Sequence, residues 1–135
     1  NKRMLSSMTP TIVEDLNGDL FLVLGSPGGS TIITTVAQII LNIIDKRMNI
    51  KDAVEQARFH HQWLPDVIYF EPFNFSDETL NDLKNRGHNV SFKRSIGEAN
   101  SIQIIHLEDL DKENNKIKMY WGAADSRRDA SAIGY

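Results

Sequence analysis

A glycine-rich turn and a pair of serines are the parts of this sequence whose residue types could do chemistry. Residues 25–30 read GSPGGS and join an apolar run to a second apolar run with a different period. A buried strand, a glycine turn and a helix start together present several unpaired backbone N–H groups, and the helix dipole favours negative charge there. Gly28 and Gly29 have no Cβ, so a ligand can approach the main chain closely. Such a turn can hold a phosphate, a carboxylate or the oxyanion of an acyl-transfer intermediate.

The residues of this turn alone leave other interpretations open. A simple tight connection is the commonest role of a glycine-rich turn. A phosphate-binding loop is not favoured, because the Lys-Ser/Thr ending of a P-loop and the GxGxxG spacing are both missing. A nucleophilic Ser26 is not favoured either, because GSPG does not fit G-x-S-x-G and Pro27 lacks the N–H that should follow such a serine.

The serine pair is Ser6-Ser7, within KRMLSSMTP near the start of the chain. Two adjacent hydroxyls, each with a backbone N–H, can hold a small carboxylate by neutral hydrogen bonds. Taken alone, such a pair near a terminus is more commonly solvated or part of a cap.

The elements that must position these residues belong to an ordinary globular domain. At 135 residues the chain fits one domain with a real core, and 41% hydrophobic and 24% charged residues argue against disorder. The net charge of −3 argues against nucleic acid as a partner. The absence of cysteine excludes disulfides, thiolate catalysis and cysteine-ligated zinc, and no apolar run, residues 39–41 included, is long enough to span a bilayer.

The hydrophobic pattern predicts helices packed on a mainly antiparallel sheet, an α+β fold. Two strands, 11–13 and 20–24, are expected to form a hairpin, with the turn at Asn17-Gly18. A helix over 31–44 shows apolar residues around most of its circumference, so we expect it to be buried on most sides, with Ser30 as its N-cap. Further helices are expected over 49–59 and 76–86, and further strands over 67–70, 89–93, 101–107 and 116–121, the last two joined by a polar loop over 108–116.

Four motifs together are far more specific than any one of them. KRMLSSMTPTIV, GSPGGSTIITTVAQ, ARFHHQWLPD and GAADSRRDASAIGY follow in an order and spacing that resemble the small subunit of γ-glutamyltranspeptidases, which are N-terminal-nucleophile hydrolases. The resemblance covers residues 1–135 and is weakest across 77–118. It implies an αββα sandwich, of which residues 1–135 would be a single incomplete domain, the C-terminal part of the small subunit, with only part of the layers.

The resemblance also implies roles for individual residues. Ser6 and Ser7 match the serines that hold the α-carboxylate of the γ-glutamyl group. Gly28 and Gly29 match the glycines whose backbone N–H groups bind the tetrahedral oxyanion. The implied reaction cleaves γ-glutamyl amides such as glutathione through a γ-glutamyl-enzyme intermediate and transfers the group to water, amino acids or peptides. No cofactor and no metal are implied.

The family's nucleophile is a threonine that becomes the new N-terminus when the precursor cuts itself, so that its α-amino group can act as the base. The resemblance places it upstream of the L-S-S-M motif, so we expect it to lie outside these 135 residues and the isolated chain to be inactive. The expected partners are the large subunit and the remainder of the small subunit, and the expected location is the periplasm or the cell surface. Without those partners, an exposed sheet edge is expected to favour self-association.

Two alternatives share these motifs: an acylase or a poly-γ-glutamate-processing relative of the same fold, and a non-catalytic family member. The sequence immediately upstream would distinguish an enzyme from a non-catalytic family member, since an exposed threonine at the cleavage point supports an enzyme.

Three further clusters are expected to be structural. Adjacent His60 and His61 point in different directions and have no ligand partner at helical spacing, so we expect a packed, hydrogen-bonded corner with Trp63 rather than a metal site. Residues 125–129, DSRRD, are expected to pair their charges, and residues 108–111, EDLD, lack the glycine and spacing of a calcium loop.

Overall fold

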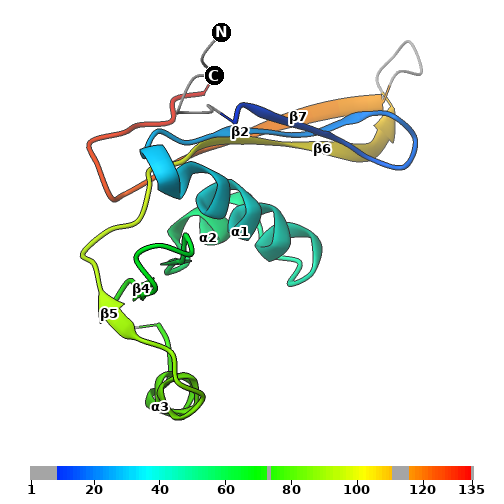
Figure 1. The fold of residues 1–135 in the computed structure, drawn as a ribbon. Helices are drawn as coiled ribbons and strands as arrows, with labels where there is room; N and C mark the ends of the chain where they lie inside the picture. The colour runs from blue at the N-terminus through cyan, green and yellow to red at the C-terminus, as the bar shows by residue number, and fades with distance from the viewer. Residues whose placement is uncertain (1–8, 73, 111–115, 135) are drawn as a thin grey trace, which may run out of the picture.

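The main sheet has four antiparallel strands in the order β1-β2-β6-β7. The structure is a computed structural model and describes residues 9–72, 74–110 and 116–134. The strands are β1 (Thr11–Glu14), β2 (Leu20–Gly25), β6 (Asn100–Leu110) and β7 (Lys116–Ala124). Figure 1 shows α1 (Ile32–Ile44) and α2 (Ile50–Glu55) covering one face of this sheet.

The predicted β1–β2 hairpin is confirmed, with Thr11 opposite Leu24. Its loop is longer than a two-residue turn. The Asp15 carboxylate accepts the backbone N–H groups of Asn17 (2.8 Å) and Asp19 (2.9 Å), and Gly18 takes a φ of 80° that favours glycine. These local bonds close the loop and set the register of the hairpin.

The core lies between the main sheet and the two helices. Leu22 and Leu24 of β2 pack there with Val36, Ile39 and Ile43 of α1, together with Ile50, Ala53, Val54, Ala99 and Ala123. Side chains alternate along a strand, so the paired residues Val23 and Ile102 point to the opposite face, where they are 36% and 41% exposed. The helices therefore cover only one face of the main sheet, and on the other face Ala132 lies next to Gly122.

The α1 helix is packed on one side only, so the expectation that it is buried on most sides is wrong for this structure. Ile33, Leu41 and Ile44 lie on its outer side and are 59%, 51% and 51% exposed. The apolar residues around the whole helix need two surfaces to cover them, and the main sheet with α2 supplies only one. The expectation of an incomplete set of layers is consistent with this arrangement.

A second, smaller sheet lies beyond the helices (Figure 1). It consists of β3 (Phe59–His60), β4 (Ile68–Phe70) and β5 (Val90–Phe92), with β3 antiparallel and β5 parallel to β4. The connection from β4 to β5 contains α3 (Asp77–Asn85). As predicted, α3 begins with an acidic first turn and ends before Gly87, which has a φ of 92°.

The predicted second helix is too long, because α2 ends at Glu55 and residues 59–60 form β3 instead. In a continued helix the Arg58 N–H would donate to the carbonyl of Val54. That carbonyl instead accepts from the guanidinium groups of Arg58 (2.7 Å) and Arg127 (3.0 Å), while the Arg58 N–H donates to Glu71 (2.8 Å). The side chain of Arg58 itself, together with Glu71 and the distant Arg127, thus replaces the helical hydrogen bond.

The predicted N-cap of the first helix is also wrong. Ser30 lies inside η1 (Gly29–Thr31), a 3-10 turn that precedes α1, and the N-cap position of α1 is Thr31. The glycine turn therefore joins the helix through a tighter turn than the sequence predicts.

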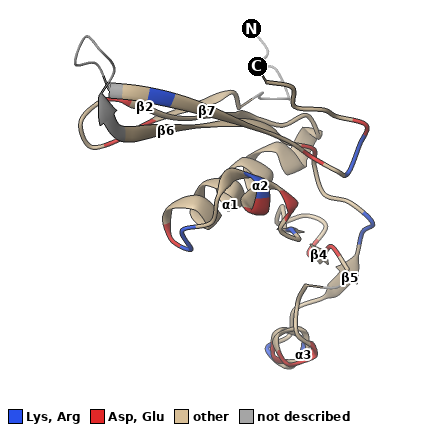
Figure 2. Ribbon diagram, turned by 180° about the vertical axis from the view of Figure 1, so that it is seen from behind, with Lys and Arg blue, Asp and Glu red and all other residues tan. Residues whose placement is uncertain are grey.

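The fold class is confirmed as α+β, with helices packed on a mainly antiparallel sheet. In Figure 2 the described parts of β2, β6 and β7 are mostly tan, with a blue band on β7, as expected for strands that build a core. Among the residues that the structure describes, no helix combines the length and apolar character needed to cross a membrane.

Candidate functional site

The glycine turn lies exposed at the end of β2. Residues 27–30 are all exposed, and the backbone of Gly28 and Gly29 takes φ values of 140° and 59°. Within the described part of the chain, no hydrogen bond is formed by the N–H of Gly28 or of Gly29. Two neighbouring donors that the fold leaves unpaired at the surface can therefore bind an external oxygen atom.

The two glycines are constrained differently. A Cβ on Gly28 would lie 2.5 Å from Thr31 Oγ1, while a Cβ on Gly29 would meet nothing within 4 Å. Thr31 holds the Gly28 carbonyl by its hydroxyl (3.0 Å) and its N–H (3.2 Å). The Gly28 carbonyl is thus tied to the start of α1, which fixes the shape of the turn.

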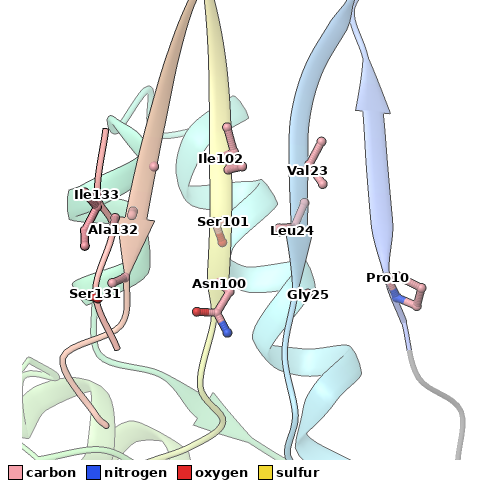
Figure 3. A pocket seen from close by; sticks show the side chains of 13 residues that line it. Pro10, Val23, Leu24, Gly25, Asn100, Ser101, Ile102, Ser131, Ala132 and Ile133 are labelled. Carbon is pink, nitrogen blue, oxygen red and sulfur yellow. The ribbon is translucent and has the colours of Figure 1, made fainter. Parts of the chain in front are cut away.

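The serine pair, Ser6 and Ser7, lies outside the described residues. The chain that follows it does reach the glycine turn, because β1 starts beside the end of β2. Pro10 and Gly25 line the same pocket of about 520 Å³, together with Asn100 of β6 and the C-terminal residues Ser131, Ala132 and Ile133 (Figure 3). Pro10 is therefore at the same end of the main sheet as the glycine turn.

Residues 95–99, here named the backing segment, pass directly behind the glycine turn. Gly97 packs so closely on α1 that a Cβ there would lie 2.3 Å from Thr35 Oγ1, and its Cα is 3.5 Å from the Cβ position of Gly28. The Glu98 N–H donates to Ser26 Oγ (3.2 Å), whose hydroxyl in turn donates to the Pro27 carbonyl (2.7 Å). Ser26 therefore links the glycine turn to the backing segment.

A buried charge cluster, formed by Arg58, Glu71, Asp125 and Arg127, holds the other side of the backing segment. Arg58 and Asp125 form an ion pair of 2.8 Å with side chains 2% and 0% exposed, and Arg127 pairs with both Glu71 and Asp125. The predicted charge pairing within residues 125–129 is confirmed for Asp125 and Arg127, since Arg127 donates to Asp125 Oδ1 (3.0 Å).

The cluster binds the backing segment through backbone groups. The Asp125 carboxylate accepts the Ala99 N–H (2.8 Å), and the Glu71 carboxylate accepts the Ile96 N–H (2.6 Å). Arg58 donates to the Ile96 carbonyl (3.0 Å). These three bonds hold the backbone of the backing segment in place behind the glycine turn.

The charged forms of Asp125 and Arg127 are favoured by their partners in this cluster. Burial by itself would raise the pKa of the Asp125 carboxyl, but the charge of Arg58 and the N–H groups of Arg127 and Ala99 outweigh it, and the pKa is lowered. Burial would lower the pKa of Arg127, but bonds to Glu71 and Asp125 outweigh it and raise it. Burial and the nearby charge of Arg127 lower the pKa of Arg58.

A second, polar pocket of about 240 Å³ adjoins the glycine turn. Its lining consists of Pro27, Gly28 and Thr31 on one side and of Lys93, Ser95, Gly97, Glu98 and Arg128 on the other. Arg128 Nε lies 3.2 Å from Glu98 Oε2, and Lys93 Nζ lies 3.9 Å from the centroid of the Tyr69 ring. The pocket therefore combines charged side chains with the backbone of the glycine turn.

The histidine pair forms a hydrogen-bonded corner, as expected. His60 is buried and bonds to Thr34 Oγ1 (2.8 Å) and Gln62 Oε1 (3.0 Å), while His61 pairs with Asp66 (3.0 Å). Trp63 does not pack into this corner, because it is 77% exposed, so that part of the expectation is wrong.

One group of residues has the types that ligate metals. Single side-chain atoms of Asp15, Asp19 and His106 lie within 4.8 Å of one another. Lys118 Nζ is 3.5 Å from Asp19 Oδ1 and already places a positive charge there. The side chains of residues 108–111, which were considered for calcium, lie outside the described residues.

The sequence alone does not identify Arg58 and Glu71 as residues that hold the backing segment behind the glycine turn. Each is a single charged residue with no local pattern around it. Arg58 pairs with Asp125, 67 positions away, and Glu71 pairs with Arg127, 56 positions away. The only available signal is that Arg58 lies within ARFHHQWLPD, one of the four motifs.

Comparisons with known proteins agree with the motifs. A family described as gamma-glutamyltranspeptidase matches residues 1–135. A glutathione hydrolase proenzyme of Escherichia coli (strain K12) is 50% identical over 104 residues, which is 77% of this chain and 18% of that protein. Another, from Pseudomonas sp. (strain A14), is 36% identical over 135 residues, which is 99% of this chain and 23% of that protein. The chain thus spans about a fifth of the length of these curated relatives.

Solved structures share the fold. A Helicobacter pylori gamma-glutamyltranspeptidase with a T380A mutation has a TM-score of 0.84 and 44% identity, covering 95% of this chain and 64% of that chain. The transpeptidase enzyme CapD of Bacillus anthracis has a TM-score of 0.75 and 26% identity, covering 99% of this chain and 74% of that chain.

Proposed function

Because the chain belongs to the γ-glutamyltranspeptidase family, we propose that it forms part of an enzyme that cleaves γ-glutamyl amides such as glutathione. The γ-glutamyl group is transferred to water, amino acids or peptides. The observation that carries this proposal is the exposed glycine turn, whose Gly28 and Gly29 N–H groups have no partner among the described residues. The names of the relatives, glutathione hydrolase and gamma-glutamyltranspeptidase, support the same chemistry.

The chemistry follows from what each group can do. A threonine upstream of Ser6 attacks the γ-carbonyl carbon, and its α-amino group takes the hydroxyl proton. The carbonyl oxygen gains negative charge in the tetrahedral intermediate, and the N–H groups of Gly28 and Gly29 donate to it. The amine leaves with a proton, and water or another amine then attacks the ester. Ser6 and Ser7 hold the α-carboxylate of the donor throughout.

The partners and the location are part of the same proposal. The large subunit and the remainder of the small subunit complete the site, and several relatives are named proenzymes, which supports processing of one precursor into subunits. The exposed apolar residues on the open face of the main sheet and on the outer side of α1 fit such partners. We propose that the enzyme is located in the periplasm or at the cell surface.

The test uses the assembled enzyme and a chromogenic γ-glutamyl anilide. The enzyme is expected to release the aniline from this donor far faster than from the 4-aminobutyryl anilide, which keeps the amino group but lacks the α-carboxylate. A double variant, Ser6→Ala with Ser7→Ala, is expected to raise KM for the γ-glutamyl donor. No release of aniline by the unmodified enzyme would contradict the proposed function.

A further inference from the structure

We propose that the polar pocket between the glycine turn and Arg128 is the subsite for the amine that enters or leaves, and that it binds the carboxylate of an amino acid or peptide. This inference rests on the proposed γ-glutamyl transfer. It adds the second substrate, to which the sequence motifs assign no residue.

The position of the pocket suits the second substrate. The pocket is lined by Gly28 itself, so an occupant lies next to one of the two oxyanion donors. The donor's α-carboxylate is assigned to Ser6 and Ser7, and the chain from these serines continues to Pro10, which lines the larger pocket on the side of Gly25. The two halves of the reaction, acyl group and amine, then lie on different sides of the glycine turn.

The charges of the pocket favour an anion. Lys93 and Arg128 contribute two positive charges and Glu98 one negative charge. Figure 2 shows basic residues, in blue, on the segment after β5 and on the segment after β7, which meet at this pocket. A net positive pocket attracts a carboxylate, and Ser95 adds a neutral hydroxyl donor.

Glu98 orients the guanidinium group of Arg128. The Glu98 side chain is only 18% exposed, and the backbone N–H of Glu98 donates to Ser26 Oγ. The backbone that carries the carboxylate is therefore held in place. The carboxylate contacts Arg128 at Nε (3.2 Å). The planar guanidinium group still carries its two Nη groups, which can donate two parallel hydrogen bonds to a second carboxylate.

The transfer step is balanced without any further reagent. The lone pair of the acceptor nitrogen forms a bond to the ester carbonyl carbon, and the carbon–oxygen bond to the threonine breaks when the tetrahedral intermediate collapses. A proton of the amine passes through the threonine α-amino group to the threonine oxygen. By reversal, the amine released from a donor amide leaves from the same place. Arg128 touches no reacting atom and acts by holding the far carboxylate.

The test compares two acceptors that differ only in this carboxylate, glycylglycine and glycylglycinamide, with the assembled enzyme and a γ-glutamyl anilide donor. In Arg128→Gln the ratio of kcat/KM for glycylglycine to that for glycylglycinamide is expected to fall about tenfold, through KM for glycylglycine. Arg128→Lys keeps the charge without the fork and is expected to give an intermediate ratio.

Arg86→Gln is the matched control. Arg86 also pairs through Nε with a carboxylate, that of Asp82 (2.8 Å), and its side chain is 69% exposed against 75% for Arg128. It lies just after α3, away from the glycine turn, and its loss is expected to leave the ratio unchanged. An unchanged ratio in Arg128→Gln, or an equal loss for both acceptors, would overturn the proposed subsite. If the unmodified enzyme releases no aniline, the proposed function itself fails instead.

Discussion

The glycine turn and the buried charge cluster lie on opposite sides of the backing segment. They differ in whether their polar groups have hydrogen-bond partners. The turn is exposed, and its two glycine N–H groups have no partner among the described residues. In the cluster, the single carboxylate of Asp125 accepts hydrogen bonds from Ala99, Arg58 and Arg127. One region keeps its donors free for a ligand, and the other uses its polar groups to hold the chain in place.

The difference suggests how the proposed oxyanion site at Gly28 and Gly29 is held in place, although it consists of backbone alone. Free N–H groups contribute to catalysis only if their position is fixed before charge develops on the substrate. Gly28 and Gly29 have no side chains that could hold the turn, so contacts with a neighbouring segment must fix its position. The backing segment supplies it, since Glu98 bonds to Ser26 while Ile96 and Ala99 bond to the cluster.

The largest expected effect is the loss of one charge from the cluster. Asp125→Asn leaves the buried Arg58 guanidinium without its charged partner, which is expected to lower the free energy of unfolding by about 3–5 kcal/mol. Thermal or denaturant unfolding of the assembled protein measures this. Asp82→Asn is the control, because the exposed pair of Asp82 with Arg86 is expected to contribute about 0–1 kcal/mol. Equal, small losses in both variants would remove the distinction between the cluster and an ordinary surface pair.

Gly28→Ala is expected to act on the other region and to affect rate more than stability. Its Cβ would lie 2.5 Å from Thr31 Oγ1, and its φ of 140° is unfavourable for alanine, so the turn must move. Displacing one oxyanion donor is expected to lower kcat about 100-fold to 1000-fold. The rate of release from a γ-glutamyl anilide measures it.

Gly18→Ala controls for backbone strain alone, because Gly18 also has a positive φ, 80°, but lies in the β1–β2 loop with nothing within 4 Å of its Cβ position. It is expected to reduce stability without a comparable loss of kcat. Similar losses of kcat in both variants would show that strain, rather than the oxyanion donor, explains the effect.

Acid is expected to weaken the cluster. The pKa of Asp125 is lower in the folded protein, so its charge contributes stability above the unfolded value, about 3.9. That stability is lost as the pH falls through the folded value. Melting temperature measured between pH 7 and pH 3 should therefore fall at the acid end, and the fall should be shallower in Asp125→Asn. An identical acid limb in the two proteins would contradict a stabilising charge at Asp125.

The sequence predicts the glycine turn well and the cluster poorly, for physical reasons. The turn is local: a strand, two glycines and a helix start within one short stretch, with free N–H groups as a necessary result. The cluster joins Arg58, Glu71 and Asp125 across the fold, and no short-range pattern marks these contacts. The early end of α2 has the same origin, because Arg58 and Arg127 take the Val54 carbonyl from the helix.

The smallest expected effect separates a structural serine from a catalytic one. Ser26 Oγ accepts the Glu98 N–H and donates to the Pro27 carbonyl, so Ser26→Ala removes a link between the glycine turn and the backing segment. The expected loss of stability is about 0.5–1.5 kcal/mol, with kcat reduced far less than in Gly28→Ala. Assay of the γ-glutamyl anilide decides the point. The proposed nucleophile is a threonine. Complete loss of activity in a folded Ser26→Ala protein would therefore favour Ser26 as the nucleophile, and would contradict a turn that acts only by donating N–H groups to the oxyanion.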